Sequence, residues 1–90
     1  MSVFEFEVYY EHQPSEATPF RLEDDDVERN LRLIPNDLEH FLQESRVTAT
    51  QEDYSNQRIH IRIEAPQTED EIVAEVKRAL GLAKLFRKQL

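Results

Sequence analysis

The sequence predicts an α+β fold in which helices cover one face of a mainly antiparallel three-stranded sheet. Two patterns support this prediction. Three segments alternate apolar and polar residues, and apolar residues recur at helical spacing in the segments between and after them. The resulting order of strand, helical residues, two strands and helix is typical of a two-layer sandwich. With 90 residues, the chain is expected to form a single domain over residues 1–90.

The first predicted strand covers residues 3–11, VFEFEVYYE. One of its faces carries Phe4, Phe6, Val8 and Tyr10, and the other carries Glu5, Glu7, Tyr9 and Glu11. Strict alternation with aromatic residues and valine is typical of a strand with one buried face. Residues 12–20, which include two prolines and several small polar residues, are expected to form a surface loop.

Residues 21–45 are expected to be mainly helical. Val27, Leu31 and Ile34 recur at helical spacing and favour a short helix, although the run NLRLI would also fit a short strand. Pro35 is expected to end this element, because proline lacks an N–H group and clashes with the preceding turn. Asn36, followed three residues later by glutamate, then predicts the start of a second helix.

Residues 46–52 and 58–64 are rich in β-forming residues and predict a hairpin around a loop at 53–57. The isoleucines of RIHIRIE face the core in this arrangement. If the first and third strands pair antiparallel, Glu5, Glu7 and Glu11 share the outer face with Arg58 and Arg62, as a ladder of opposite charges. One side of the first strand then stays unpaired, and an open strand of this kind predicts a homodimer or the addition of a partner strand.

The last helix is predicted from Thr68, which forms a capping box with Glu71, to the end of the chain. Its first turn is acidic and its last turns are basic, as the helix dipole favours. Leu82 and Leu85 lie off its apolar stripe among Lys and Arg residues, and they predict a protein-contact patch, with ordinary surface leucines as the alternative. The order of elements resembles a ferredoxin-like fold that lacks its last strand, a likeness that concerns the fold alone.

Composition excludes several chemistries. The chain has no cysteine, which excludes disulfides, thiolate catalysis and Cys-ligated zinc. It has one glycine, whereas phosphate-binding loops need several. The N-terminal residues do not resemble a signal peptide, and no apolar run is long enough for a membrane span, so a cytoplasmic location without membrane contact is expected, in a microbe or a phage-infected cell.

Neither a metal, a cofactor nor a catalytic residue is expected. Alternate positions in the acidic run, Asp24, Asp26, Glu28 and Asn30, match the first ligands of a calcium loop. However, Arg29 occupies the position that requires glycine, and Pro35 occupies the position of the last glutamate. The three histidines, His12, His40 and His60, have no metal-ligand spacing and no nucleophile motif beside them. An enzyme is therefore not expected.

The charge is strongly asymmetric and suggests the function. The first 45 residues contain 12 acidic and 3 basic side chains, and the last 45 contain 7 and 8, for a net charge of −8. Acidic surfaces attract basic protein surfaces, although acidic excess also serves solubility. The sequence therefore predicts a small acidic inhibitor or adaptor of a protein with a basic, nucleic-acid-handling surface. Small phage-encoded inhibitors of bacterial defence complexes, including anti-CRISPR proteins and DNA mimics, are similar in size and charge.

The residues predicted to bind this partner are Glu5, Glu7, Glu11, Glu23, Asp24, Asp25, Asp26, Glu28, Leu82 and Leu85. The first alternative function is a self-associating structural or assembly subunit, which would use the first strand and the leucine patch. A weaker alternative is a nucleic-acid-binding module that uses Arg58, His60 and Arg62. That alternative is disfavoured because the neighbouring glutamates repel phosphate and because the expected stacking aromatics are missing from this strand.

Overall fold

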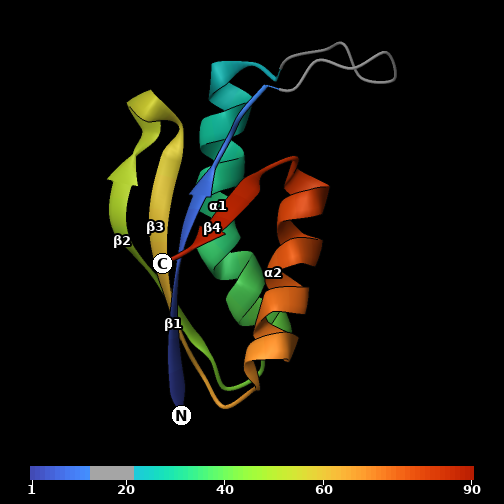
Figure 1. Cartoon of the computed structure of the whole chain (residues 1–90). Helices are drawn as coiled ribbons and strands as arrows, with labels where there is room; N and C mark the ends of the chain where they lie inside the picture. Colours follow the sequence, from blue (N-terminus) through green and yellow to red (C-terminus); the bar gives the residue numbers. More distant parts are fainter. Residues whose placement is uncertain (13–21) are drawn as a thin grey trace.

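The computed structural model describes residues 1–12 and 22–90, which form four strands and two α-helices (Figure 1). In chain order the elements are β1 (Ser2–Tyr9), α1 (Asp24–Phe41), β2 (Arg46–Asp53), the 3₁₀ turn η1 (Tyr54–Asn56), β3 (Arg58–Ala65), α2 (Glu69–Ala83) and β4 (Phe86–Gln89). The α+β class is confirmed. From residue 13 onward, the predicted loop at 12–20 lies outside the described residues.

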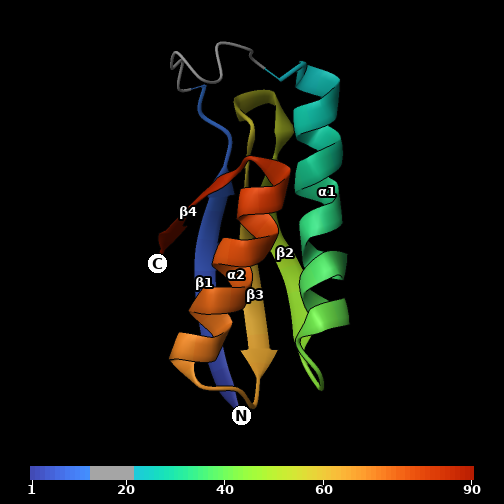
Figure 2. The ribbon, with the colours of Figure 1, turned by 90° about the vertical axis from the view of Figure 1, so that its right-hand side faces the viewer.

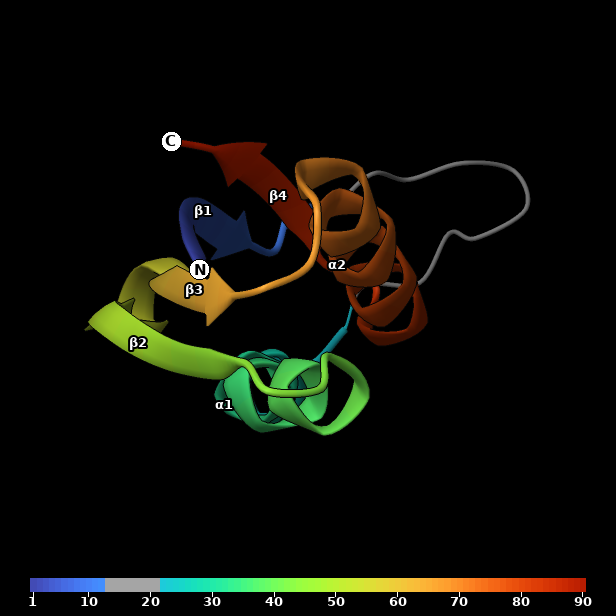
Figure 3. The same cartoon turned by 90° about the horizontal axis from the view of Figure 1, so that it is seen from below.

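The sheet is antiparallel with the strand order β2-β3-β1-β4. Both helices lie on one face, and the other face is left uncovered by them (Figures 2 and 3). The sheet thus contains one strand more than the sequence predicted. With this strand the β-α-β-β-α-β order of the ferredoxin-like fold is complete.

The predicted first strand is confirmed, but its expected open edge is wrong. Phe6 and Val8 are fully buried beneath the helices, as the alternation requires. β1 pairs with β3 on one side and with β4 on the other, and the backbone N–H of Leu90 donates to the carbonyl oxygen of Glu5 at 2.9 Å. β4 thus covers the Phe6–Tyr9 half of the edge that was expected to be open.

A single helix, α1, replaces the two helices predicted on either side of Pro35. Its buried residues are Val27, Leu31, Ile34 and Leu38, which form one stripe that continues past the proline. Proline in a helix interior removes one backbone hydrogen bond and costs about 3 kcal/mol. Burial of four aliphatic side chains contributes more, at roughly 1.5–3 kcal/mol for each side chain. The strand alternative for this segment is therefore wrong as well.

The predicted hairpin is confirmed as β2 and β3, with a register shift between Ala49 and Gln51. The connection between the two strands forms η1. The side chain of Asp53, the residue just before η1, accepts a hydrogen bond from the backbone N–H of Asn56. Gln57 then adopts a left-handed conformation with φ 57° and leads the chain into β3. The inward-facing residues Ile59, Ile61, Ile63 and Ala65 are buried in the core.

The capping box at the start of α2 is confirmed: the Thr68 side chain accepts from the Glu71 backbone N–H, and the Glu71 side chain accepts from the Thr68 backbone. The predicted end of this helix is wrong. α2 stops at Ala83, Lys84 turns left-handed with φ 58°, and the remaining residues form β4. Glycine usually occupies such a turn, so a lysine there gave no stop signal in the sequence.

Leu85 follows this turn and is 5% exposed within the core, which contradicts its prediction as a surface contact residue. Leu82, in contrast, is 75% exposed as predicted. The core lies between the helix layer and the inner face of the sheet. In the described part of the chain, neither helix combines the length and the apolar character that crossing a membrane requires.

Candidate functional site

The densest group of acidic side chains lies at the start of α1. Asp24, Asp25 and Asp26 form its first turn, where the N–H groups of the helix favour negative charge. The preceding Glu23 makes no side-chain cap hydrogen bond. These positions were all predicted as partner-binding residues. These residues do not form a calcium-binding loop. Asp24, Asp26 and Glu28 lie in the helix α1, whereas a calcium loop wraps around its ion.

The tip of the β2–β3 hairpin lies against this helix start. The Gln57 side-chain amide donates to Asp24 Oδ1 at 2.9 Å, and the Arg32 guanidinium lies 4.1 Å from the centroid of the Tyr54 ring. Together α1 and the hairpin enclose a cleft of about 440 Å³, which we call the acidic cleft. It is lined by Asp24, Asp25, Glu28, Tyr54, Ser55 and Gln57.

Electrostatics within the hairpin add to the negative character of this end. Hydrogen bonds from the Asn56 and Ser55 side chains lower the pKa of Asp53, so its carboxylate stays ionised. Burial raises the pKa of Tyr54, and the neighbouring Glu52 carboxylate raises it further. Tyr54 therefore remains a neutral phenol, and the Arg32 guanidinium already lies over its ring.

The acidic cleft is suited to a cationic side chain. Carboxylates on one wall provide charge-assisted hydrogen bonds, and an aromatic ring on the other attracts a guanidinium or ammonium group through its π-electrons. The contact between Arg32 and Tyr54 is an internal example of the second interaction. Arg32 also lies 3.6 Å from Glu28, so one carboxylate of the cleft has a partial counter-ion within the helix, and Arg29 lies 3.1 Å from the neighbouring Asp26.

The predicted acidic row on β1 does not join this cleft. Glu5 and Glu7 lie on the uncovered sheet face, where Glu5 pairs across the strands with Arg62, and Glu7 pairs with His60. The Glu7 carboxylate is 3.0 Å from His60 Nε2 and 3.8 Å from the Arg58 guanidinium. The strand pairing behind the predicted charge ladder is thus confirmed, and within this row Glu7 is the residue with ion pairs in the described part of the chain. Glu11 lies beyond the end of β1 and is exposed.

The three residues of the nucleic-acid alternative occupy the same ladder. Arg58 and His60 share Glu7, and Arg62 lies 3.4 Å from Glu64. Cations held by adjacent carboxylates are poor ligands for phosphate, because the glutamates repel it. The structure therefore brings these three residues together on one face without producing a basic surface there.

The exposed leucine of the predicted contact patch lines a groove between the helices. Leu82 faces Leu33 across a space of about 500 Å³ whose other lining residues are Asn30, Ile34, Asn36, Asp37, His40, Ala79 and Ala83. Leu33 is 56% exposed, and the sequence analysis did not single it out.

The hairpin residues of the acidic cleft, Tyr54, Ser55 and Gln57, were also missed. Only the order and direction of the elements in the fold bring these three residues to the start of α1. Successive elements in this fold run in opposite directions, so the start of α1 and the end of β2 lie at the same end of the sheet (Figure 1). Among residues 1–12 and 22–90, no group of three or more His, Asp or Glu side chains is arranged to hold a metal ion.

Comparison of this chain with protein-family models, with curated proteins and with solved structures gave no match.

Proposed function

We propose that this chain acts by binding rather than by catalysis, and that its acidic cleft takes a lysine or arginine side chain from the basic surface of a partner protein. The observation that carries the proposal is that three carboxylates and one aromatic ring, from segments about 30 residues apart, line one concave site. A concave site surrounds a side chain and removes water from it, which strengthens each charged hydrogen bond.

The partner class follows from the chemistry of the cleft and from the net charge of −8. Opposite potentials speed encounter and select basic surfaces, which are common on proteins that handle nucleic acid. An inhibitor would cover such a surface, and an adaptor would attach to it. Both roles use the same contact, so one experiment tests the binding mode they share.

The chain offers a matched pair of variants for this test. Asp25 is the second residue of α1 and lines the acidic cleft, whereas Asp70 is the second residue of α2 and does not line it. Asp25→Lys and Asp70→Lys change the net charge equally and disturb the helix dipole equally. We expect Asp25→Lys to weaken partner binding by about tenfold or more, or about 1.4 kcal/mol, and Asp70→Lys to have much less effect.

The measurement is a tagged pulldown from nuclease-treated lysate with the wild-type protein and both variants, quantified by mass spectrometry. It is followed by affinity measurements on the purified pair over a range of salt concentrations. A partner lost only with Asp25→Lys, and with a flatter salt dependence in that variant, supports the proposal. Equal retention by the two variants, or equal loss, excludes the acidic cleft as the binding site.

Self-association is a second candidate, because Leu33 and Leu82 are both more than half exposed on opposite sides of one groove. A second copy would bury both leucines. In that case sedimentation equilibrium should give a dimer mass for the wild-type protein and a monomer mass for Leu82→Asp. Leu90→Asp is the control, since Leu90 is also exposed but lies at the end of β4. A monomeric wild-type protein would exclude this function.

A further inference from the structure

The basic side chains in the described part of the chain fall into two groups. Five arginines lie within ion-pair distance of a carboxylate: Arg29, Arg32, Arg58, Arg62 and Arg78. Five others have no ion pair among residues 1–12 and 22–90, and four of these five gather along α2 and β4: Lys77, Lys84, Arg87 and Lys88. We call these four residues the cationic edge. Arg46, also without an ion pair there, lies on β2 at the opposite edge of the sheet.

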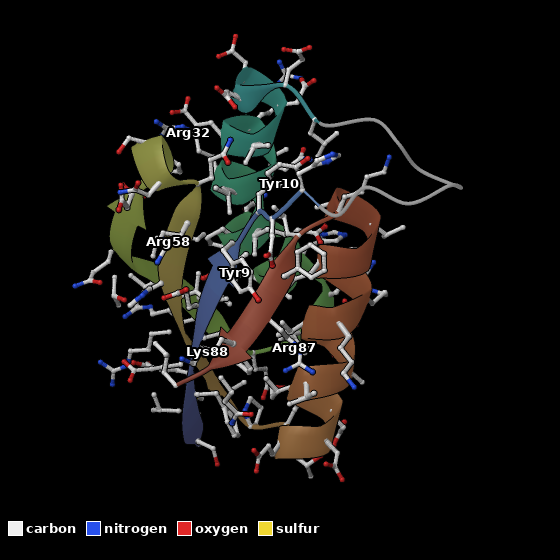
Figure 4. All side chains as sticks on the ribbon, turned by 45° about the horizontal axis from the view of Figure 1, so that its top comes forward. Tyr9, Tyr10, Arg32, Arg58, Arg87 and Lys88 are labelled. Atoms are coloured by element: carbon white, nitrogen blue, oxygen red, sulfur yellow. The ribbon has the colours of Figure 1, made fainter. Side chains whose placement is uncertain are left out.

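The cationic edge wraps around one side of the molecule because β4 is an edge strand. Its successive side chains point to opposite faces of the sheet. Lys88 lies on the uncovered face, and Arg87 lies toward α2, where it lines a groove of about 330 Å³ with Lys77 and the backbone of Gly81 (Figure 4). Lys84 occupies the turn that connects the two elements.

A pair of aromatic rings adjoins these cations on the uncovered face. Tyr9 of β1 and Phe86 of β4 are cross-strand neighbours whose rings stack with their centroids 5.9 Å apart and an interplanar angle of 27°. Both residues are partly exposed, and no helix covers this face of the sheet (Figure 3). Across the strands Tyr9 is opposite Arg58 on β3 and opposite Phe86 on β4.

We propose that the cationic edge binds the backbone of a single-stranded nucleic acid, with a base stacked on the Tyr9–Phe86 pair. Lysine and arginine contact phosphates, and an aromatic platform accepts any base because every base has a π-face. An acidic peptide would also satisfy the cations, but it has no use for the rings. A duplex hides its base faces in the stack, which favours a single strand.

The charge of the whole molecule affects how strongly the cationic edge can bind nucleic acid. The net charge of −8 repels nucleic acid at long range, so the affinity depends on local contacts at the cationic edge. This site is separate from the acidic cleft and does not rest on the proposed function. It adjoins the surface of Arg58, His60 and Arg62, because Lys88 is the cross-strand neighbour of Glu7, but the charges of those three residues are used within the sheet.

The test is fluorescence anisotropy with a labelled oligothymidine of about 10 nucleotides at low salt. Lys88→Glu is compared with Arg46→Glu, because both residues lie on the uncovered face of an edge strand and both variants change the charge equally. We expect Lys88→Glu to weaken binding by at least fivefold and Arg46→Glu to have little effect. Equal effects of the two variants would mean that only overall charge matters, which overturns the proposal.

A second pair of variants removes the concern that a loss of binding reflects misfolding. A Cβ built on Gly81 meets no neighbouring side chain within 4 Å, and a helical position gains from losing a glycine. Gly81→Glu should therefore fold, place a negative charge at the groove and weaken binding. Gly81→Lys, at the same position, should preserve or strengthen it. Weaker binding with both variants contradicts the proposed path of the phosphates.

The stacked base has its own readout. The chain has three tyrosines and no tryptophan, so base stacking should quench its tyrosine emission. Phe86→Leu keeps an apolar side chain without a ring, and it should lower the affinity by about fivefold or more. If a polyglutamate peptide competes as well as unlabelled oligothymidine, the site binds anions in general and the nucleic-acid proposal is wrong. Asp25→Lys should leave oligothymidine binding intact, which separates failure of this proposal from failure of the acidic cleft.

Discussion

The backbone N–H of Leu85 donates to the carbonyl oxygen of Leu80 at 2.9 Å, and this bond closes the end of α2. The N–H of Lys84 donates to the Gly81 carbonyl oxygen at 3.3 Å, so the two bonds together form a Schellman motif. Both leucines are buried, which supplies the apolar contact that accompanies the motif. The turn sends the chain back along β1, and β4 and its cations exist because of it.

Lys84→Gly should stabilise the protein. Lys84 has φ 58°, a conformation that costs a residue with a Cβ about 1–2 kcal/mol and costs glycine almost nothing. We therefore expect the free energy of unfolding, from urea denaturation, to rise by about 1 kcal/mol. Lys77→Gly in the helix interior is the control and should lower it by about 1 kcal/mol. If Lys84→Gly is destabilising, the left-handed turn is wrong.

Leu85→Ala and Leu82→Ala should differ sharply in stability. Leu85 is 5% exposed in the core, and Leu82 is 75% exposed three residues earlier. Truncating a buried leucine costs about 2–5 kcal/mol, whereas surface substitutions usually stay within about 0.5 kcal/mol. Thermal unfolding followed by circular dichroism measures both. If the two variants lose similar amounts of stability, the longer helix that the sequence predicted is correct instead.

Pro35→Ala should raise stability. Alanine restores the N–H group that proline lacks and removes the clash of the ring with the preceding turn. Since Pro35 lies inside α1, we expect a gain of about 1–3 kcal/mol in the free energy of unfolding, measured with urea. Asn36→Ala, one residue further, should change it by less than about 1 kcal/mol. An unchanged or lower stability in Pro35→Ala would show that the helix needs the proline at this point.

Asp53 should contribute to stability at neutral pH and lose that contribution in acid. Its pKa is lowered in the folded protein, first by the Asn56 side chain and then by Ser55. The unfolded chain binds the proton more readily, so the contribution is present above about pH 4 and disappears as the pH falls below the folded pKa. Urea midpoints at pH 7 and pH 3 should therefore differ less in Asn56→Ala than in the wild type. The effect of Ser55→Ala should be smaller, and a reversed order would contradict the assignment.

The elements predicted correctly have local causes. The alternation of β1 and the hairpin follows from side chains that point to two faces, and the capping box of Thr68 is a contact within four residues. The end of a helix at Pro35 and the continuation of a helix through Lys84 were predicted wrongly. Each residue is locally unfavourable where it stands, and packing of distant residues overrides the local preference. The acidic half of the candidate site was visible in the sequence. Its Tyr54 wall was not, since only the folded topology brings the hairpin to the helix.

The position of β1 in the middle of the sheet bears on how the protein is made. Both of its neighbours come from the second half of the chain, and Glu7 pairs with Lys88 about 80 residues later. At a synthesis rate of about 5–20 residues per second, β1 waits roughly 4–16 s for its last partner to be translated. During that interval its free backbone groups can pair with another nascent chain. The alternating glutamates of β1 repel the same strand of a neighbouring copy, which disfavours cross-pairing before β4 is available.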